Sequence, residues 1–148
     1  MLFRSNDFVS GELEHAIVSC WKDTRADLIL LEGQSALRNP SGPCGLELLI
    51  SGNARHVVLV HAPKRQYFDN EKHWGAIPPV ETEIDIIRKF NSEIIALALN
   101  TEGCTLEEAL AYQQQYESLL GIPVLLPLEA GVGGMMGVLR DLVVRVAG

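Results

Sequence analysis

The chain has 148 residues, 47% of them hydrophobic, and its 12 basic and 19 acidic residues give a net charge of −7. This length and composition suffice for one domain with a substantial core. A nucleic-acid backbone is bound by clustered Lys and Arg, so the negative charge argues against a nucleic-acid partner. No apolar run approaches the roughly 18 residues that span a bilayer, so we also expect no membrane partner.

The cysteines Cys20, Cys44 and Cys104 are an odd number at wide spacing, and they contain no C-x-x-C pair. They indicate neither a disulfide framework nor a zinc ribbon, and they fit a reducing, cytoplasmic setting. Residues 1–5 precede the first recognisable pattern of the sequence. We interpret them as a non-native leader and expect that the natural sequence upstream of residue 1 is missing.

The first expected element is an amphipathic helix from Ser10 to about Thr24. Its apolar residues are three and four positions apart, which places them on one face of a helix. Acidic residues lie in the first turn, where the helix dipole favours them.

A buried strand is expected next, over residues 26–31. An apolar run without polar alternation is typical of a strand covered on both faces in a parallel sheet, and we take it as a central strand. Glu32 and Gly33 follow directly, at the strand end where the ligands of open α/β sheets collect. We therefore predict that Glu32 is a metal or phosphate ligand; the alternative is that it ends the strand in solvent.

The middle of the chain is predicted to form a loop, a short helix and a second strand. Residues 34–44 are rich in turn formers, and residues 45–51 form a helical run closed by Gly52. The run 56–61 is short, apolar and β-branched, which is typical of a buried strand. The loop after it, residues 62–78, is long for a compact domain, as is typical of loops that close over a site.

The second half alternates between helices and strands. In order, we predict a helix over 79–90, a strand over 93–99, a helix over 106–120 with Thr105 as N-cap, a strand over 122–126 and a helix over about 138–146. The glycines of residues 131–137 do not have the G-x-G-x-x-G spacing, so we interpret this stretch as a flexible connection. No G-x-x-x-x-G-K-[ST] occurs, so a phosphate-binding loop would lie upstream of residue 1.

Four expected strands that alternate with helices predict an α/β fold with three layers and a mainly parallel sheet. The carboxyl ends of parallel strands lie at one edge, and each expected strand ends in polar or turn-forming residues. At the second strand end, His61 is a candidate acid or base, and Lys64 and Arg65 are candidate ligands of a carboxylate or phosphate. The alternative is a structural histidine followed by two solvated cations.

Three parts of the sequence resemble a known family. They are Asp7-Phe-Val-Ser-Gly-Glu-Leu-Glu14, Leu30-Leu-Glu-Gly-Gln-Ser35, and His61-Ala-Pro-Lys-Arg-Gln66 with Leu97-Ala-Leu-Asn-Thr-Glu-Gly103. Over residues 6–130 the chain resembles the C-terminal part of an uncharacterised-domain family whose members include a D-glutamate N-acetyltransferase that uses acetyl-CoA. It is more distantly similar to the nucleotide-binding domain of dethiobiotin synthetase, which has a P-loop NTPase fold.

The resemblance implies roles for particular residues. Glu32 would help to hold magnesium, with Asp7 as a weaker candidate for the same ion. The adenine of coenzyme A or ATP would be contacted by Asn100, Thr101, Leu126 and Pro127.

The substrate side of the site is implied by a His-x-Pro-x-Arg pattern, which His61, Pro63 and Arg65 match. Arg65, with Lys64 beside it, would face an anionic substrate. His61 would be the base that takes the amine proton.

The function that the resemblance implies is N-acetylation of an acidic amino acid similar to D-glutamate, with acetyl-CoA as donor. Residues 6–148 would be a single α/β domain at the C-terminal end of a larger cytoplasmic enzyme, which would act on a small molecule as a homo-oligomer and use neither zinc nor flavin. The family's phosphate loop is absent here, so we expect this fragment to be inactive alone. The alternatives are an ATP- and Mg-dependent ligase resembling dethiobiotin synthetase, and a non-catalytic module that binds an adenine nucleotide or a partner subunit.

Overall fold

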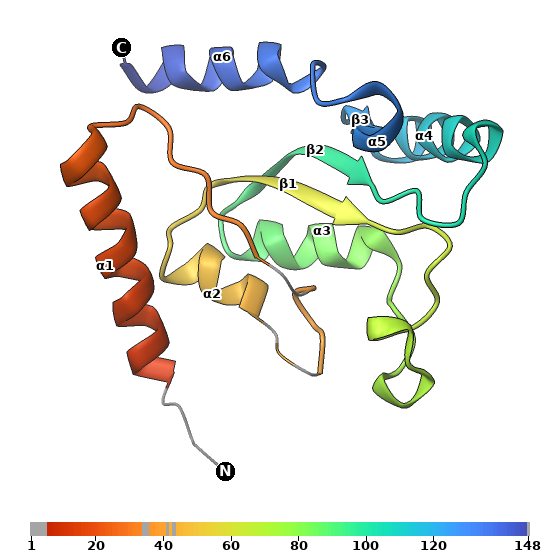
Figure 1. Cartoon of the computed structure of the whole chain (residues 1–148), viewed down its shortest axis with the longest axis horizontal. Coiled ribbons are helices and arrows are strands. Elements are labelled where there is room, and N and C mark those ends of the chain that lie inside the picture. The colour runs from red at the N-terminus through yellow and green to blue at the C-terminus, as the bar shows by residue number, and fades with distance from the viewer. Residues whose placement is uncertain (1–5, 34–35, 41, 43, 148) are drawn as a thin grey trace. The chain divides into compact units, whose positions relative to one another are not determined.

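The computed structural model describes residues 6–33, 36–40, 42 and 44–147, and residues 1–5, the predicted leader, lie outside them. The chain divides into two compact units, residues 1–55 and residues 56–148 (Figure 1).

The first unit contains helices α1 (Asn6–Thr24) and α2 (Cys44–Ile50). The predicted first helix is confirmed, although it begins four residues before Ser10. It ends where predicted, because Arg25 adopts a left-handed conformation with φ of 51°. The Arg25 guanidinium lies 4.1 Å from the centre of the Trp21 ring, a cation–π contact over the last turn.

The predicted strand over residues 26–31 is wrong. Residues 25–33 form neither helix nor strand, and Leu30 is 77% exposed. A strand is stabilised by backbone hydrogen bonds to a neighbouring strand, and no described segment pairs with this stretch. Its hydrophobic pattern alone does not supply that partner.

Helix α2 confirms the short helix predicted for residues 45–51. Glu47 joins it to α1, since the Ser10 hydroxyl donates to Glu47 Oε1 at 2.5 Å and the Ser51 hydroxyl donates to the same oxygen. These two hydrogen bonds hold the pKa of Glu47 below its usual value. A Cβ at Gly52 would lie 2.6 Å from the Leu48 carbonyl oxygen, so only glycine fits after this helix.

The second unit contains a parallel three-stranded sheet in the order β1 (His56–His61), β2 (Glu93–Leu99), β3 (Val124–Leu125). The limits of β1 and β2 match the prediction. Strand β2 pairs with both β1 and β3 and is therefore the central strand of the described sheet. The predicted strand over residues 122–126 is shortened to β3, because Pro123 has no N–H to donate to the ladder.

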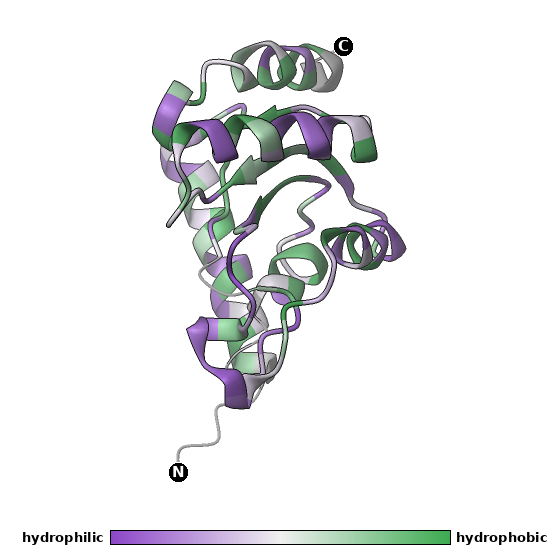
Figure 2. Ribbon diagram, turned by 90° about the vertical axis from the view of Figure 1, so that its right-hand side faces the viewer, coloured by the Kyte–Doolittle hydropathy of each residue, from purple (hydrophilic) through white to green (hydrophobic). Residues whose placement is uncertain are grey.

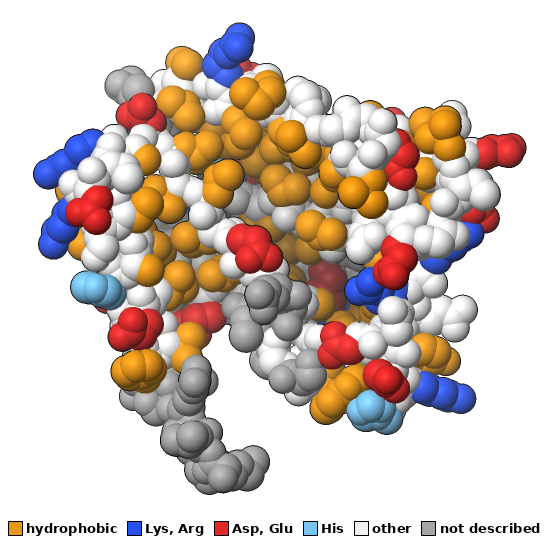
Figure 3. Space-filling model, in the orientation of Figure 1, with side chains coloured by type: hydrophobic (Ala, Val, Ile, Leu, Met, Phe, Trp, Pro, Cys, Tyr) orange, Lys and Arg blue, Asp and Glu red, His pale blue; other side chains and the backbone are white. Residues whose placement is uncertain are grey.

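Strand β1 was expected to be covered on both faces, which is wrong. It lies at an edge of the described sheet, its residues alternate between exposed and half-buried, and Val60 is 67% exposed. Figure 3, in the orientation of Figure 1, accordingly shows hydrophobic side chains on the surface of the second unit.

The helices of the second unit are α3 (Val80–Lys89), α4 (Leu106–Leu120), α5 (Pro127–Ala130) and α6 (Met135–Ala147). Helices α3 and α6 lie on opposite sides of the sheet in Figure 1, and the strands between them are largely hydrophobic in Figure 2. This arrangement confirms the predicted α/β fold with a parallel sheet between helical layers.

The core has two parts because alternate residues of β2 point to opposite faces. On one face, Ala96 and Ala98 form a cluster with Leu125 and with Met135 of α6. Leu97 lies on the other face and is fully buried, as is Ile87 of α3. Burial of Met135 explains why α6 begins inside the glycine stretch that was predicted to be a flexible connection.

The long loop between β1 and α3 is confirmed, and it carries two short 3₁₀ turns, η1 (Phe68–Asn70) and η2 (Lys72–Trp74). Its two arms are joined by an antiparallel bridge between Tyr67 and Ala76. Phe68 is buried and anchors the loop.

The N-terminus of α4 begins at the predicted N-cap Thr105, which forms a capping box with Glu108. Thr105 Oγ1 accepts a hydrogen bond from the Glu108 N–H at 3.2 Å, and Glu108 Oε2 accepts one from the Thr105 N–H at 2.7 Å. Gly121 ends the helix with a left-handed φ of 64°.

We expect Thr105→Ala to lower the free energy of unfolding by about 1 kcal/mol, because it leaves an N–H at the helix start without its acceptor. Urea unfolding followed by circular dichroism measures this loss. Thr105→Ser keeps the accepting hydroxyl and is the matched control. Equal stability of the alanine and serine variants would show that the cap contributes little.

Candidate functional site

The carboxyl ends of the three strands bring three segments of the second unit to one edge of the sheet. The sequence predicted four such segments, and the one that begins at Glu32 follows no strand. The residues after β1, β2 and β3 begin with Ala62, Asn100 and Leu126. The first two segments start in register, because the Asn100 N–H donates to the His61 carbonyl at 2.8 Å. Ligands of parallel α/β sheets bind at this edge.

His61 is half-buried at this edge and pairs with a tyrosine of α4. Its Nε2 lies 3.0 Å from Tyr116 Oη, and the two rings meet edge to face with centroids 5.3 Å apart. Burial lowers the pKa of His61 and raises that of Tyr116. Both groups are therefore neutral near pH 7, which leaves His61 able to accept a proton.

Tyr116 was not among the predicted site residues, although its spacing in the sequence was informative. Glu108, Tyr112 and Tyr116 follow one another at intervals of four, which places them on one face of a helix. Tyr112 stacks on Tyr116 with ring centroids 6.5 Å apart. We call this row of three residues the α4 stripe.

The predicted anion ligand Lys64 is held by the segments that follow β2. Its Nζ donates to Glu108 Oε2 at 2.6 Å and to the Gly103 carbonyl at 2.8 Å. The hydrogen bond with Glu108 raises the pKa of Lys64, and the same bond lowers the pKa of Glu108. Lys64 therefore ties the loop after β1 to the start of α4.

Arg65, the second predicted anion ligand, also has an acidic partner. Its Nη2 donates to Glu102 Oε2 at 2.7 Å, and both side chains are partly solvent-exposed. An exposed ion pair of this kind contributes only about 0–1 kcal/mol. Breaking this pair therefore costs little, and the guanidinium carries further N–H donors besides the one that bonds to Glu102.

The predicted adenine ligand Asn100 is half-buried, and its Oδ1 accepts from the Glu102 N–H at 3.1 Å. This bond fixes the orientation of the amide. Among the described residues, the Asn100 Nδ2 has no hydrogen-bond partner. It is therefore a donor available to a ligand.

The other residues predicted to contact the adenine are Thr101, Leu126 and Pro127, and they differ in burial and in hydrogen bonding. Thr101 is buried, and its hydroxyl donates to Glu129 Oε1 at 2.5 Å. The Leu126 side chain is buried as well, and Pro127 is the first residue of α5. The Leu126 carbonyl accepts from the N–H groups of Glu129 and Ala130. In this segment Pro127 is half-buried and Glu129 is exposed.

The two predicted metal ligands belong to the first unit. Glu32 is exposed, and Asp7 lies in α1 with a side chain outside the described part of the structure. Within the described residues no three His, Cys, Asp or Glu side chains are placed to share a metal ion. Their meeting with His61 and Asn100 stays a prediction, because His61 and Asn100 belong to the other unit.

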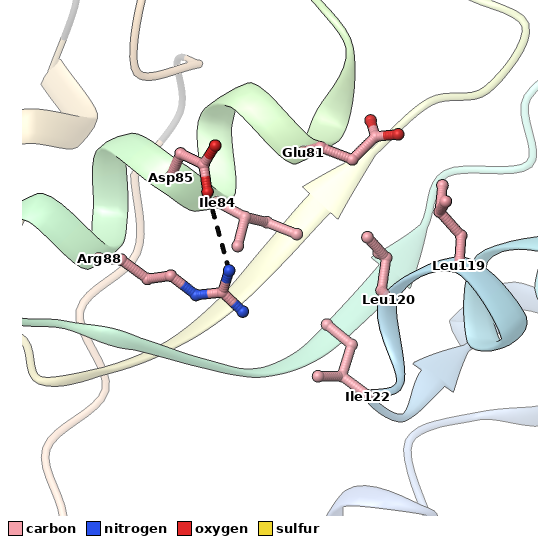
Figure 4. A pocket seen from close by; sticks show the side chains of 7 residues that line it. All are labelled: Glu81, Ile84, Asp85, Arg88, Leu119, Leu120 and Ile122. Carbon is pink, nitrogen blue, oxygen red and sulfur yellow. Dashed lines mark ion pairs between the residues drawn. The ribbon is translucent and has the colours of Figure 1, made fainter.

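A shallow pocket lies between α3 and the end of α4 (Figure 4). Its lining residues are Glu81, Ile84, Asp85, Arg88, Leu119, Leu120 and Ile122. The Asp85 and Arg88 side chains are paired at 3.7 Å, while Glu81 lies at the other end of the α3 row in Figure 4. Burial dominates the lowered pKa of His61 and the raised pKa of Tyr116, and the charge of Glu81 opposes the first shift and adds to the second.

The fold and the strand-end edge together define the chain as a parallel α/β domain. Its family is shown by a family model, described as "Domain of unknown function (DUF1611_C) P-loop domain", that matches residues 4–136. The chain belongs to this DUF1611 family.

Two curated relatives carry the name D-glutamate N-acetyltransferase. The protein from Tritonibacter scottomollicae is 27% identical over 140 residues, which cover 90% of this chain and 41% of the relative. The protein from a Pseudoalteromonas species is 25% identical over 137 residues, which cover 88% of this chain and 40% of the relative. The chain thus spans about two-fifths of the length of these relatives.

A crystal structure of a DUF1611 family protein from Anabaena variabilis has the same fold. The TM-score is 0.77 with 23% identity, and the match covers 96% of this chain and 42% of that one. The described helices include none that is both long and apolar enough to cross a bilayer.

Proposed function

We propose that this chain is the C-terminal part of an acyltransferase that moves the acetyl group of acetyl-CoA to the amine of an acidic amino acid similar to D-glutamate. The proposal goes beyond the family itself, which is named only as a P-loop domain of unknown function. Its main support is the name shared by both curated relatives. The chemistry of the sheet edge agrees with this reaction.

Three groups at the edge have the properties that acetyl transfer to an amine needs. A neutral imidazole, His61, is available as general base. Arg65 offers a guanidinium for a substrate carboxylate. The amide nitrogen of Asn100 offers a donor for a ring nitrogen of adenine.

In this mechanism, adenine and pyrophosphate binding position the thioester beside the substrate amine, and this positioning supplies part of the rate enhancement. Arg65 orients the amino acid through its carboxylate. His61 takes the proton of the amine as the nitrogen attacks the acetyl carbon, and the proton then passes to the departing thiolate.

ATP- and Mg-dependent ligation is the second candidate, and the P-loop description of the family favours it. The described residues do not assemble a magnesium site, since Glu32 is the single candidate ligand with a described side chain. We therefore derive no step through a metal ion.

Ligand binding and turnover separate the candidates. A ligand that binds a folded protein raises its melting temperature, so the longer protein of which this chain is the proposed C-terminal part is heated with acetyl-CoA or with ATP and Mg²⁺. Acetyl transfer predicts a shift with acetyl-CoA, and the release of free thiol with formation of N-acetylglutamate when D-glutamate is added. A shift with ATP and Mg²⁺ alone supports ligation, and no shift with either supports a non-catalytic module.

We expect Asn100→Ala to weaken binding of the adenine ligand about tenfold, because one good hydrogen bond contributes roughly 1–1.5 kcal/mol. Calorimetric titration with coenzyme A measures the change. Gln114→Ala, at an exposed position of α4, is the control and should bind as the unmodified protein does. Unchanged affinity in the Asn100 variant would contradict the adenine-site assignment.

A further inference from the structure

The pairing of His61 with Tyr116 has chemical consequences that neither residue has alone. The imidazole Nε2 and the phenol oxygen are 3.0 Å apart, so one of them donates a hydrogen bond to the other. The phenol is a weak acid with a pKa near 10, whereas imidazole is a base with a pKa near 6.5. The favoured bond therefore runs from the phenol O–H to the Nε2 lone pair.

We propose that Tyr116 and His61 form a proton relay, in which the Tyr116 hydroxyl donates to Nε2 and fixes the imidazole in the tautomer that carries its proton on Nδ1. This role for Tyr116 rests on the proposed acetyl transfer. Because Tyr116 occupies Nε2 and Nδ1 already holds a proton, His61 receives a further proton through the phenol oxygen. Tyr116 is then the catalytic residue that meets the substrate amine, and His61 is the base behind it.

The proton transfers of the relay balance in both steps of the reaction, the attack of the amine and the release of the thiol. As the neutral amine nitrogen bonds to the thioester carbonyl carbon, its N–H proton moves to Tyr116 Oη and the phenol proton moves to His61 Nε2. The carbon–sulfur bond then breaks. The imidazolium returns its proton through the phenol to the thiolate, which leaves an amide and a free thiol.

The surroundings of the pair favour this assignment. Tyr112 stacks on the Tyr116 ring and restricts its rotation, while the edge-to-face contact fixes the imidazole against the same ring. Glu81 of α3 is the acidic group that acts on both residues. Its negative charge stabilises the imidazolium that forms when His61 takes the proton.

The test is nitrogen NMR of the ¹⁵N-labelled 148-residue chain, because protonated and unprotonated imidazole nitrogens have clearly different chemical shifts. His61→Gln identifies the His61 signals. We expect Nδ1 to be protonated and Nε2 unprotonated above pH 7. Tyr116→Phe should give averaged shifts of two tautomers, and Tyr112→Phe, which removes the neighbouring hydroxyl on the same helix face, should keep the original pattern.

A proton on Nε2 in the unmodified chain, or an unchanged spectrum in Tyr116→Phe, would overturn the relay. In the acetylation assay of the longer protein of which this chain is the proposed C-terminal part, Tyr116→Phe should lower kcat at least about tenfold with little change in KM, and Tyr112→Phe should stay within about twofold. If the NMR pattern is as expected but the unmodified longer protein acetylates no amine, the hydrogen-bonded pair stands and the proposed acetyl transfer fails.

Discussion

Replacing His61 with glutamine is expected to reduce acetyl transfer about 10²–10⁴-fold, the usual contribution of a positioned general base. Glutamine keeps a polar side chain that can bond to Tyr116 but accepts no proton near neutral pH. The loss should fall on kcat, because His61 is assigned to proton transfer rather than to binding. Steady-state kinetics with acetyl-CoA and D-glutamate measure it in the longer protein of which this chain is the proposed C-terminal part.

The control for this variant is His56→Gln at the other end of the same strand. His56 is exposed and lies 3.9 Å from Glu93, outside the strand-end site. Its replacement should leave kcat within about twofold. Equal activity of the two variants would remove His61 from the mechanism.

The same residue gives stability a dependence on pH. Since burial lowers the folded-state pKa of His61, the unfolded chain binds its proton first as the pH falls. This part of the stability is fully present above the unfolded value near 6.5, and it is lost as the pH falls below that value. His61→Gln should remove this part of the acid destabilisation, which unfolding at pH 7.5 and pH 5.5 compares.

The largest loss of stability is expected from Leu97→Ala, at about 2–5 kcal/mol. Leu97 is fully buried in the central strand β2, and it is paired with both neighbouring strands. Removing its side chain gives up buried apolar surface and leaves a cavity that the packed neighbours fill only in part. Urea unfolding followed by circular dichroism measures the change in midpoint.

Val60→Ala on the edge strand β1 is the matched control for Leu97→Ala. Its side chain is exposed, so its loss should cost less than about 1 kcal/mol, within the range of strand propensity. Losses of similar size in the two variants would contradict the assignment of β2 as the centre of the core.

Local signals in the sequence were enough for most elements of the second unit. The apolar runs of β1 and β2 and the cap at Thr105 each depend on residues close together in the chain. The sheet edge was also predictable, because parallel strands necessarily bring their carboxyl ends together. The sequence alone was therefore enough to choose His61 and Asn100 as site candidates.

Residues 26–31 show what a local hydrophobic pattern leaves undetermined. Its hydrophobicity favours burial, but a strand also requires a partner that donates and accepts backbone hydrogen bonds. The described structure supplies none, and the segment is neither helix nor strand. Similarly, the pattern of β1 does not reveal that it lies at an edge and exposes Val60.

The sequence by itself determined the type and order of most elements of the second unit and the residues that follow its strands, because hydrophobic period, capping and turn chemistry act over a few neighbouring positions. Only the tertiary structure decided the partners of those residues. Tyr116 lies 55 positions from His61, and Glu102 lies 37 positions from Arg65. Contacts across such separations are set by how α4 and the strand-end loops pack on the sheet, which no local pattern encodes.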